Sequence, residues 1–109
     1  MITTTRTYEF SAAHKIEGHS KCGGLHGHNY VVTVAMDTEE TESQMALECV
    51  KLDAVAQPII DYVSNKYLIS TQNIQMEDPY TDVALSCGDG RILGIPTTSP
   101  EHLAEYFAL

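Results

Sequence analysis

Basic residues are scarce in this sequence of 109 residues: six lysines and arginines stand against fifteen aspartates and glutamates, for a formal net charge of −9. Broad electrostatic binding to nucleic acid or to an anionic membrane needs a basic face, so we expect neither partner. No apolar run approaches the roughly 20 residues that cross a bilayer. The amino terminus also lacks the basic and apolar segments of a signal peptide.

Cysteine is sparse as well, and its pattern is not that of a disulfide framework. Cys22, Cys49 and Cys87 are odd in number and form no C-x-x-C motif. A reducing, cytoplasmic location is therefore the expectation. Hydrophobic residues make up 43% of the chain and charged residues 19%, which is typical of a globular protein. A chain of this length predicts a single domain over residues 1–109.

Hydrophobic periodicity predicts that the chain begins with two strands. Residues 2–14 and 25–37 alternate with a period of two, so their even-numbered side chains share one face of each strand. Between residues 44 and 63 the apolar residues recur at helical spacing, and Pro58 predicts a kink or a break in that helix. The members of this apolar stripe are Leu52, Val55, Ala56, Ile59 and Val63.

The second half of the sequence gives weaker signals. Residues 64–82 show no clear pattern. Residues 83–95 could form a hairpin around Asp89-Gly90, since Asp-Gly is a strong turn former. Ser99-Pro100-Glu101 is typical of a helix start, with a capping serine, a proline and an acid in the first turn.

Four of the five histidines lie within residues 14–28. His26 and His28 project to the same face of a predicted strand, with Gly27 between them. His14 ends the preceding strand, so antiparallel pairing would bring three imidazoles together. Three histidines plus an open position are typical of catalytic zinc. The alternative is a polar pair on a wet face; the apolar residues that continue this face argue against it, because unpaired imidazoles are costly to bury.

Several residues beside the histidines suggest further chemistry. Cys22 is either a fourth ligand, a reactive thiol whose pKa a nearby cation would lower, or an inert buried thiol. Lys15 and Lys21 flank the histidines in an acidic chain, where they either receive an anionic substrate or remain solvated. His19 either orients a ligand or lies in solvent. We expect His102, just inside a helix start, to be exposed.

The run Phe10-Ser-Ala-Ala-His14, followed by Lys21-Cys-Gly-Gly-Leu-His-Gly-His-Asn-Tyr30, resembles the zinc-binding signature of the 6-pyruvoyltetrahydropterin synthase family. That family includes 6-carboxytetrahydropterin synthase of the queuosine pathway. The resemblance returns at Glu101-His-Leu-Ala-Glu-Tyr106. It implies an α+β tunnelling fold, in which an antiparallel sheet with two helices on one face assembles into a homo-oligomeric barrel, usually a hexamer.

The resemblance also implies a function. His14, His26 and His28 would hold a zinc ion (Zn2+), and Cys22 would act as the proton-transfer base. The implied enzyme is a zinc-dependent lyase that acts on 7,8-dihydroneopterin triphosphate, in which zinc polarises side-chain oxygens while acid–base groups move protons. The short step from Cys22 to His26 favours 6-carboxytetrahydropterin synthesis over 6-pyruvoyl formation.

Two features depart from the family pattern. An L-D-H triplet, whose Asp and His assist the cysteine, is replaced by Val63-Ser64-Asn65, and neither a hydroxyl nor an amide titrates near neutral pH. The last two strands of the family, with a glutamate that grips the pterin, are not present after the predicted second helix. The alternatives are therefore a degenerate member that binds zinc and a pterin with little or no catalysis, or a truncated product that scarcely folds alone.

Overall fold

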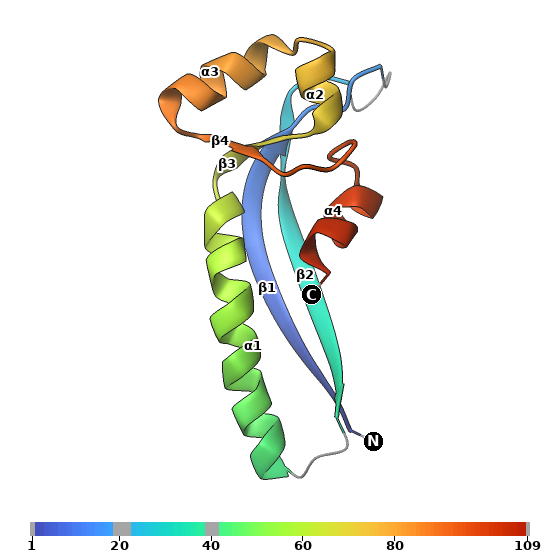
Figure 1. The fold of residues 1–109 in the computed structure, drawn as a ribbon, viewed down its shortest axis with the longest axis vertical. Helices are drawn as coiled ribbons and strands as arrows, with labels where there is room; N and C mark the ends of the chain where they lie inside the picture. The colour runs from blue at the N-terminus through green and yellow to red at the C-terminus, as the bar shows by residue number, and fades with distance from the viewer. Residues whose placement is uncertain (1, 19–22, 39–41, 109) are drawn as a thin grey trace.

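The computed structural model describes residues 2–18, 23–38 and 42–108. A long antiparallel hairpin of β1 (Ile2–His14) and β2 (His26–Thr38) is followed by α1 (Glu42–Val63), which runs back along it (Figure 1). The remaining elements are β3 (Lys66–Ile69), α2 (Thr71–Gln75), α3 (Pro79–Cys87), β4 (Gly90–Ile92) and α4 (Pro100–Phe107). None of the described helices is long and apolar enough to cross a membrane.

The four strands form one mixed sheet in the order β2-β1-β3-β4. This arrangement confirms the α+β class, with both predicted long strands within one residue of their expected bounds. The expectation of a wholly antiparallel sheet is wrong for the second half, because β3 pairs parallel to β1 and β4 pairs parallel to β3. Strand β2 and helix α1 lie between β1 and β3, and α2 and α3 lie between β3 and β4, so each parallel pair is joined by the long crossover connection that parallel pairing requires.

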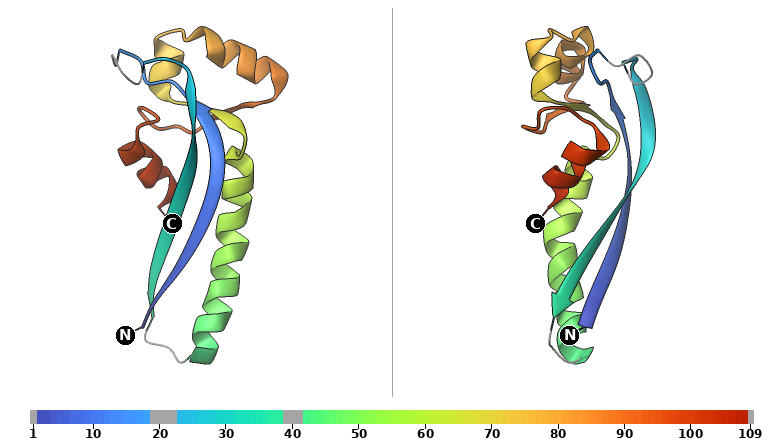
Figure 2. Two further views of the ribbon diagram at one scale, coloured as in Figure 1. Left: turned by 180° about the vertical axis from the view of Figure 1, so that it is seen from behind. Right: turned by 90° about the vertical axis from the view of Figure 1, so that its right-hand side faces the viewer.

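One face of the hairpin is covered and the other is open. Figure 2 shows α1 and α4 on the same side of the sheet, as the family resemblance implied. The even-numbered side chains of β1 point to this side, and Tyr8, Phe10 and Ala12 are buried there. The core that they share with the helices includes Ala56, Ile60, Val63, Leu68, Leu93, Ile95 and Leu103. The alternation of the strands therefore decides which face carries the histidines.

Helix α1 continues through Pro58, so the break expected there is absent. The buried positions around the proline are Ala56 and Ile60, which pack into the core. Val55, by contrast, is 54% exposed, so the apolar stripe is rotated from the one expected. Pro58 itself is exposed, where its missing N–H is tolerated because burial of its neighbours outweighs one lost helical hydrogen bond.

The hairpin expected at residues 83–95 is also wrong, because α3 and β4 occupy this stretch. Asp78 caps α3 by accepting a hydrogen bond from the backbone N–H of Tyr80, and Pro79 occupies the first turn. Gly88 ends the helix at φ 79°, a left-handed conformation that glycine adopts at little cost. The Asp-Pro pair and this glycine are start and stop signals that outweigh the Asp-Gly turn.

Replacing Pro58 with Ala should stabilise the protein. The substitution restores a backbone N–H that can donate to the carbonyl of Ala54, on an exposed position of a helix that is already continuous. We expect the free energy of unfolding to rise by about 1–3 kcal/mol in urea titrations. Gln57→Ala, on the exposed surface beside it, should change stability by only a few tenths. An unchanged or lower stability of Pro58→Ala would show that the helix is adapted to the proline.

Candidate metal centre

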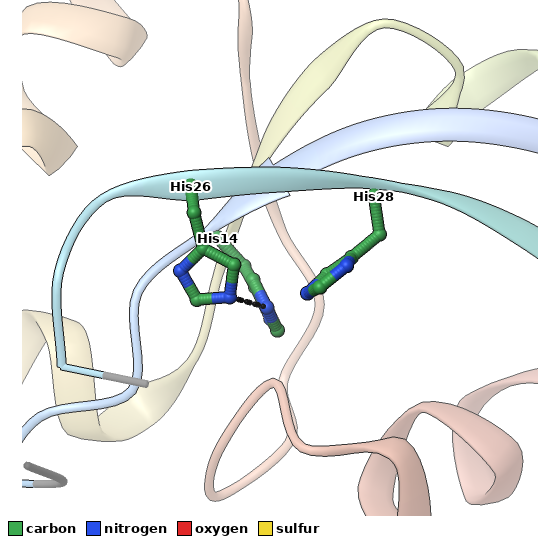
Figure 3. Close-up of side chains that lie close together, drawn as sticks. All are labelled: His14, His26 and His28. Atoms are coloured by element: carbon green, nitrogen blue, oxygen red, sulfur yellow. Dashed lines mark hydrogen bonds between the residues drawn. The ribbon is translucent and has the colours of Figure 1, made fainter. Parts of the chain in front are cut away.

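The register of the hairpin brings three histidines together. His14 is the cross-strand partner of His26, and Ala12 is the partner of His28, so all three rings lie on the covered face. Figure 3 shows the rings of His26 and His28 extending from β2 and that of His14 from β1, to one side of the sheet. Their ligand nitrogens lie within 4.8 Å of one another. The strands thus assemble the cluster that the sequence predicted.

Two backbone carbonyls determine which ring nitrogen of His14 and of His26 carries the hydrogen. His14 Nδ1 lies 3.0 Å from the carbonyl oxygen of Thr98, and His26 Nδ1 lies 2.7 Å from that of Gly24. A carbonyl oxygen only accepts, so each Nδ1 is the donor and carries the hydrogen. In the neutral form of both rings, the lone pair is therefore on Nε2.

The two Nε2 atoms of His14 and His26 face each other at 3.0 Å. Two lone pairs at this distance repel unless a proton or a cation lies between them. Burial lowers the pKa of His14, and the neighbouring His26 and His28 lower it further, so the protonated form is disfavoured. Ligand nitrogens of a tetrahedral zinc site, with Zn–N of about 2.0–2.1 Å, lie about 3.3 Å apart. The donor set therefore fits a metal ion.

The exposure of the three rings is unequal. His14 is buried at 3%, His26 is half-buried and His28 is exposed. Next to His28 on the same face, Tyr30 stacks on Phe10 with ring centroids 4.9 Å apart. Burial raises the pKa of Tyr30 to about 12, so this ring stays neutral beside the histidines. The cluster is closed on the side of His14 and accessible on the side of His28, as a site with an open position would be.

The sequence profile described as "6-pyruvoyl tetrahydropterin synthase" matches residues 3–109, nearly the whole chain. The chain belongs to this family. The resemblance carried by the histidine signature is thereby confirmed, and the mixed sheet with helices on one face is consistent with the tunnelling fold.

Three relatives show how far the similarity extends. A protein of Archaeoglobus fulgidus is 34% identical over 73 residues, covering 67% of this chain and 60% of its own. The 6-carboxy-5,6,7,8-tetrahydropterin synthase of Rickettsia felis is 39% identical over 75 residues, covering 67% and 54%. A Methanocaldococcus jannaschii protein is 27% identical over 111 residues, covering 91% and 68%. The present chain of 109 residues thus spans little more than half the length of the Archaeoglobus and Rickettsia relatives. No solved structure gives a significant match.

Lys15, one of the two lysines expected either to receive an anionic substrate or to remain solvated, lies among carboxylates. Its Nζ is 3.3 Å from Glu17 and 3.8 Å from the fully buried side chain of Asp78. Its backbone carbonyl accepts a hydrogen bond from Asn73 at 2.9 Å. Two carboxylates already balance its charge, so Lys15 also ties the end of β1 to α2 and α3. Its assignment to an anionic substrate remains a prediction.

Ser64 and Asn65, which replace the acidic and histidine members of the family triplet, lie at the end of α1. The Ser64 hydroxyl donates to the carbonyl of Ile60 at 2.9 Å. Asn65 is exposed and has a φ of 58°, a left-handed conformation that asparagine tolerates. Both residues therefore act in ending the helix, and neither side chain offers a group that titrates near neutral pH.

Several predicted residues lie outside the described part of the chain: Cys22, Lys21 and His19. Cys87, by contrast, is described and is a free, exposed cysteine. The expectation that His102 is exposed is wrong. It is half-buried, and its Nδ1 lies 2.7 Å from Thr97 Oγ1.

Sequence reasoning missed the partners of the histidines. The contact between His14 and Thr98 joins residues 84 positions apart, and no local pattern announces it. The Gly24 carbonyl is only two residues from His26, but it is a backbone group that every residue offers. For the contact between His14 and Thr98 the sequence offered one signal, the helix start predicted at Ser99, which places a turn at a definite point of the chain.

The stability of the metal-free protein should fall below about pH 6.5. The unfolded chain protonates His14 near its ordinary pKa of 6.5, whereas burial holds the folded pKa lower. The folded state then binds fewer protons, and acid favours unfolding. Urea titrations between about pH 7.5 and about pH 5 would measure this loss. In His14→Gln the free energy of unfolding should depend less steeply on pH. An identical slope in both proteins would show that His14 does not cause the loss of stability in acid.

Proposed function

We propose that this chain acts as a zinc-dependent lyase of pterin biosynthesis on 7,8-dihydroneopterin triphosphate, in the manner of a 6-carboxytetrahydropterin synthase. The observation that carries the proposal is the pair of facing Nε2 nitrogens on His14 and His26, completed by His28. Membership of the family and the name of the Rickettsia felis relative support the choice of substrate. A 6-pyruvoyltetrahydropterin synthase is the alternative, and the two activities differ in their products.

The three histidines would hold the zinc ion, which when bound supplies the Lewis acidity that polarises oxygens of the substrate side chain. The chain prepares its ligands in advance, because the carbonyls of Thr98 and Gly24 keep the hydrogens on Nδ1 of His14 and His26. A ligand ring held in the correct tautomer binds metal without having to rearrange. The exposed side of the cluster at His28 is the side from which a substrate would approach.

We propose Cys22 as the base that takes a proton from the substrate. It lies four residues before His26 in the family signature, and a nearby cation would favour its thiolate form. Lys21, and Lys15 once released from Glu17 and Asp78, would supply positive charge for the triphosphate. These roles follow from the family pattern and from the chemistry of the residue types.

A cytoplasmic homo-oligomer, with a hexamer as the expected size, is part of the same proposal. Strand β2 lies at the edge of the described sheet. Its thirteen residues pair with β1 on one side, and no described strand pairs with them on the other. Val31 on this strand is 62% exposed. A long strand edge with an exposed apolar side chain favours pairing with another copy.

One observation favours a second candidate function, a family member that binds zinc and a pterin with little or no catalysis. Ser64 and Asn65 stand where the family has proton-transferring side chains, and the Ser64 hydroxyl is already engaged by the Ile60 carbonyl. A cysteine base without these partners would find neither a carboxylate nor an imidazole at positions 64 and 65 to receive its proton. Activity measurements distinguish this candidate from the enzyme.

Zinc analysis tests the metal site. The purified protein should retain close to one zinc per chain after dialysis, and the double variant His26→Ala/His28→Ala should retain almost none, because a single imidazole holds zinc weakly. Asn29→Ala, which changes the neighbouring residue on the opposite face, is the matched control and should keep its zinc. Stoichiometric zinc in the double variant would refute the ligand assignment.

Product analysis tests the reaction. Incubation with 7,8-dihydroneopterin triphosphate should release triphosphate and acetaldehyde if the chain is a 6-carboxytetrahydropterin synthase. Cys22→Ala should lower the rate by at least about 100-fold, the scale of general-base catalysis, whereas Cys87→Ala should leave it unchanged. Equal rates for both cysteine variants would exclude Cys22 as the base.

Restoring the missing triplet distinguishes a weak enzyme from an inert binder. Ser64→Asp combined with Asn65→His places a carboxylate and an imidazole at the end of α1, and histidine tolerates the left-handed backbone there. We expect the rate to rise by about 100-fold, the lower end of what general acid–base groups typically contribute. A zinc-loaded protein in which neither wild type nor this variant turns over would favour the non-catalytic binder.

A further inference from the structure

The turn of residues 97–99, between β4 and α4, carries the carbonyl that orients His14. Thr98 is fully buried, and its carbonyl oxygen accepts the hydrogen bond from His14 Nδ1 at 3.0 Å. This carbonyl belongs to no strand, so no sheet ladder defines its direction. Its position depends on whatever holds the turn.

The preceding residues are held by backbone hydrogen bonds from α2. The N–H groups of Thr71 and Gln72 donate to the carbonyls of Ile95 and Pro96, at 2.8 and 3.1 Å. These bonds end before the turn begins. Over residues 97–99 the contacts that remain come from side chains and from the first turn of α4.

His102, in the first turn of α4, is the centre of those contacts. Its Nδ1 lies 2.7 Å from Thr97 Oγ1 and 3.2 Å from Ser99 Oγ, on either side of Thr98. The hydroxyl of Thr97 also lies 3.0 Å from that of Ser99. Leu103 anchors the same turn, because its N–H donates to the Ser99 carbonyl and its side chain is buried in the core. One imidazole therefore joins both ends of the turn to a helix packed on the sheet.

We propose that His102 is a positioning residue for the metal centre, which acts through Thr97 and the Thr98 carbonyl on the ring of His14. This inference rests on the proposed zinc site. The carbonyl keeps the hydrogen of His14 on Nδ1 and prevents the ring from turning, so its Nε2 stays directed at the other ligands. If the hydrogen bond between His102 and Thr97 is lost, the Thr98 carbonyl shifts and His14 loses its preferred orientation.

Zinc affinity, measured by competition with a chelator, tests the role of the hydrogen bond between His102 and Thr97. Thr97→Val removes the hydroxyl with little change of shape, and His102→Ala removes the ring; each should weaken zinc binding by about 10-fold, the lower end of the effect of ligand-orienting partners. His102→Asn should restore the affinity, because its Oδ1 takes the place of Nδ1. His102→Gln places its amide one bond farther out and should not. Glu105→Gln, exposed on the same helix, should bind as wild type.

The absorption spectrum of the cobalt-substituted protein gives a second readout, since it reports the geometry of the ligands and not the stability of the fold. The cobalt spectrum should differ from that of the wild type in Thr97→Val, and in His102→Asn it should match the wild type. The affinity loss of the double variant should be smaller than the sum of the losses of Thr97→Val and His102→Ala, because both variants break the contact between His102 and Thr97.

The outcomes separate the two proposals. A wild-type protein that binds no zinc refutes the metal site and this inference with it. A wild type that binds zinc, with Thr97→Val and His102→Ala binding it equally well and giving the same cobalt spectrum, refutes the inference alone. If His102→Ala does not fold, the comparison of Thr97→Val, His102→Asn and His102→Gln decides. A lower melting temperature with unchanged affinity means a structural role only, and also refutes the inference.

Discussion

The pairing of His14 with His26 across β1 and β2 is the constraint on which the candidate metal centre depends. Side chains alternate between the faces of a strand, so a slip of one residue would move His26 and His28 to the open face of the sheet while His14 stayed on the covered one. Thirteen paired positions along the hairpin, together with the buried rings of Tyr8 and Phe10, oppose such a slip. The hydrophobic core therefore maintains the geometry of the histidines.

The same arrangement explains why the cluster suits an open site. His14 is enclosed by the turn before α4, while His28 is exposed, so the three donors converge from a closed side toward an accessible one. Structural zinc sites usually fill all four positions with protein, and catalytic sites retain one for substrate. The candidate ligands that converge here among the described residues are His14, His26 and His28.

The accuracy of the sequence predictions followed the length of each element. The two strands have thirteen residues each, long enough for alternation to identify both their bounds and their inner faces. β3 and β4 have four and three residues, too few for any period to be recognised. At Pro58 the local rule failed for another reason: the helix is held by the burial of Ala56 and Ile60, and tertiary packing overrides a local preference.

The sequence alone determined the family, the three histidines and the face on which they lie, because spacing along a strand is a local property. Only the tertiary structure decided how those histidines are held. His14 meets the carbonyl of Thr98 across 84 positions, and Lys15 meets Asp78 across the end of β1. Such contacts depend on where α3 and α4 pack on the sheet, and that packing results from the burial of the whole core, which no short stretch of residues encodes.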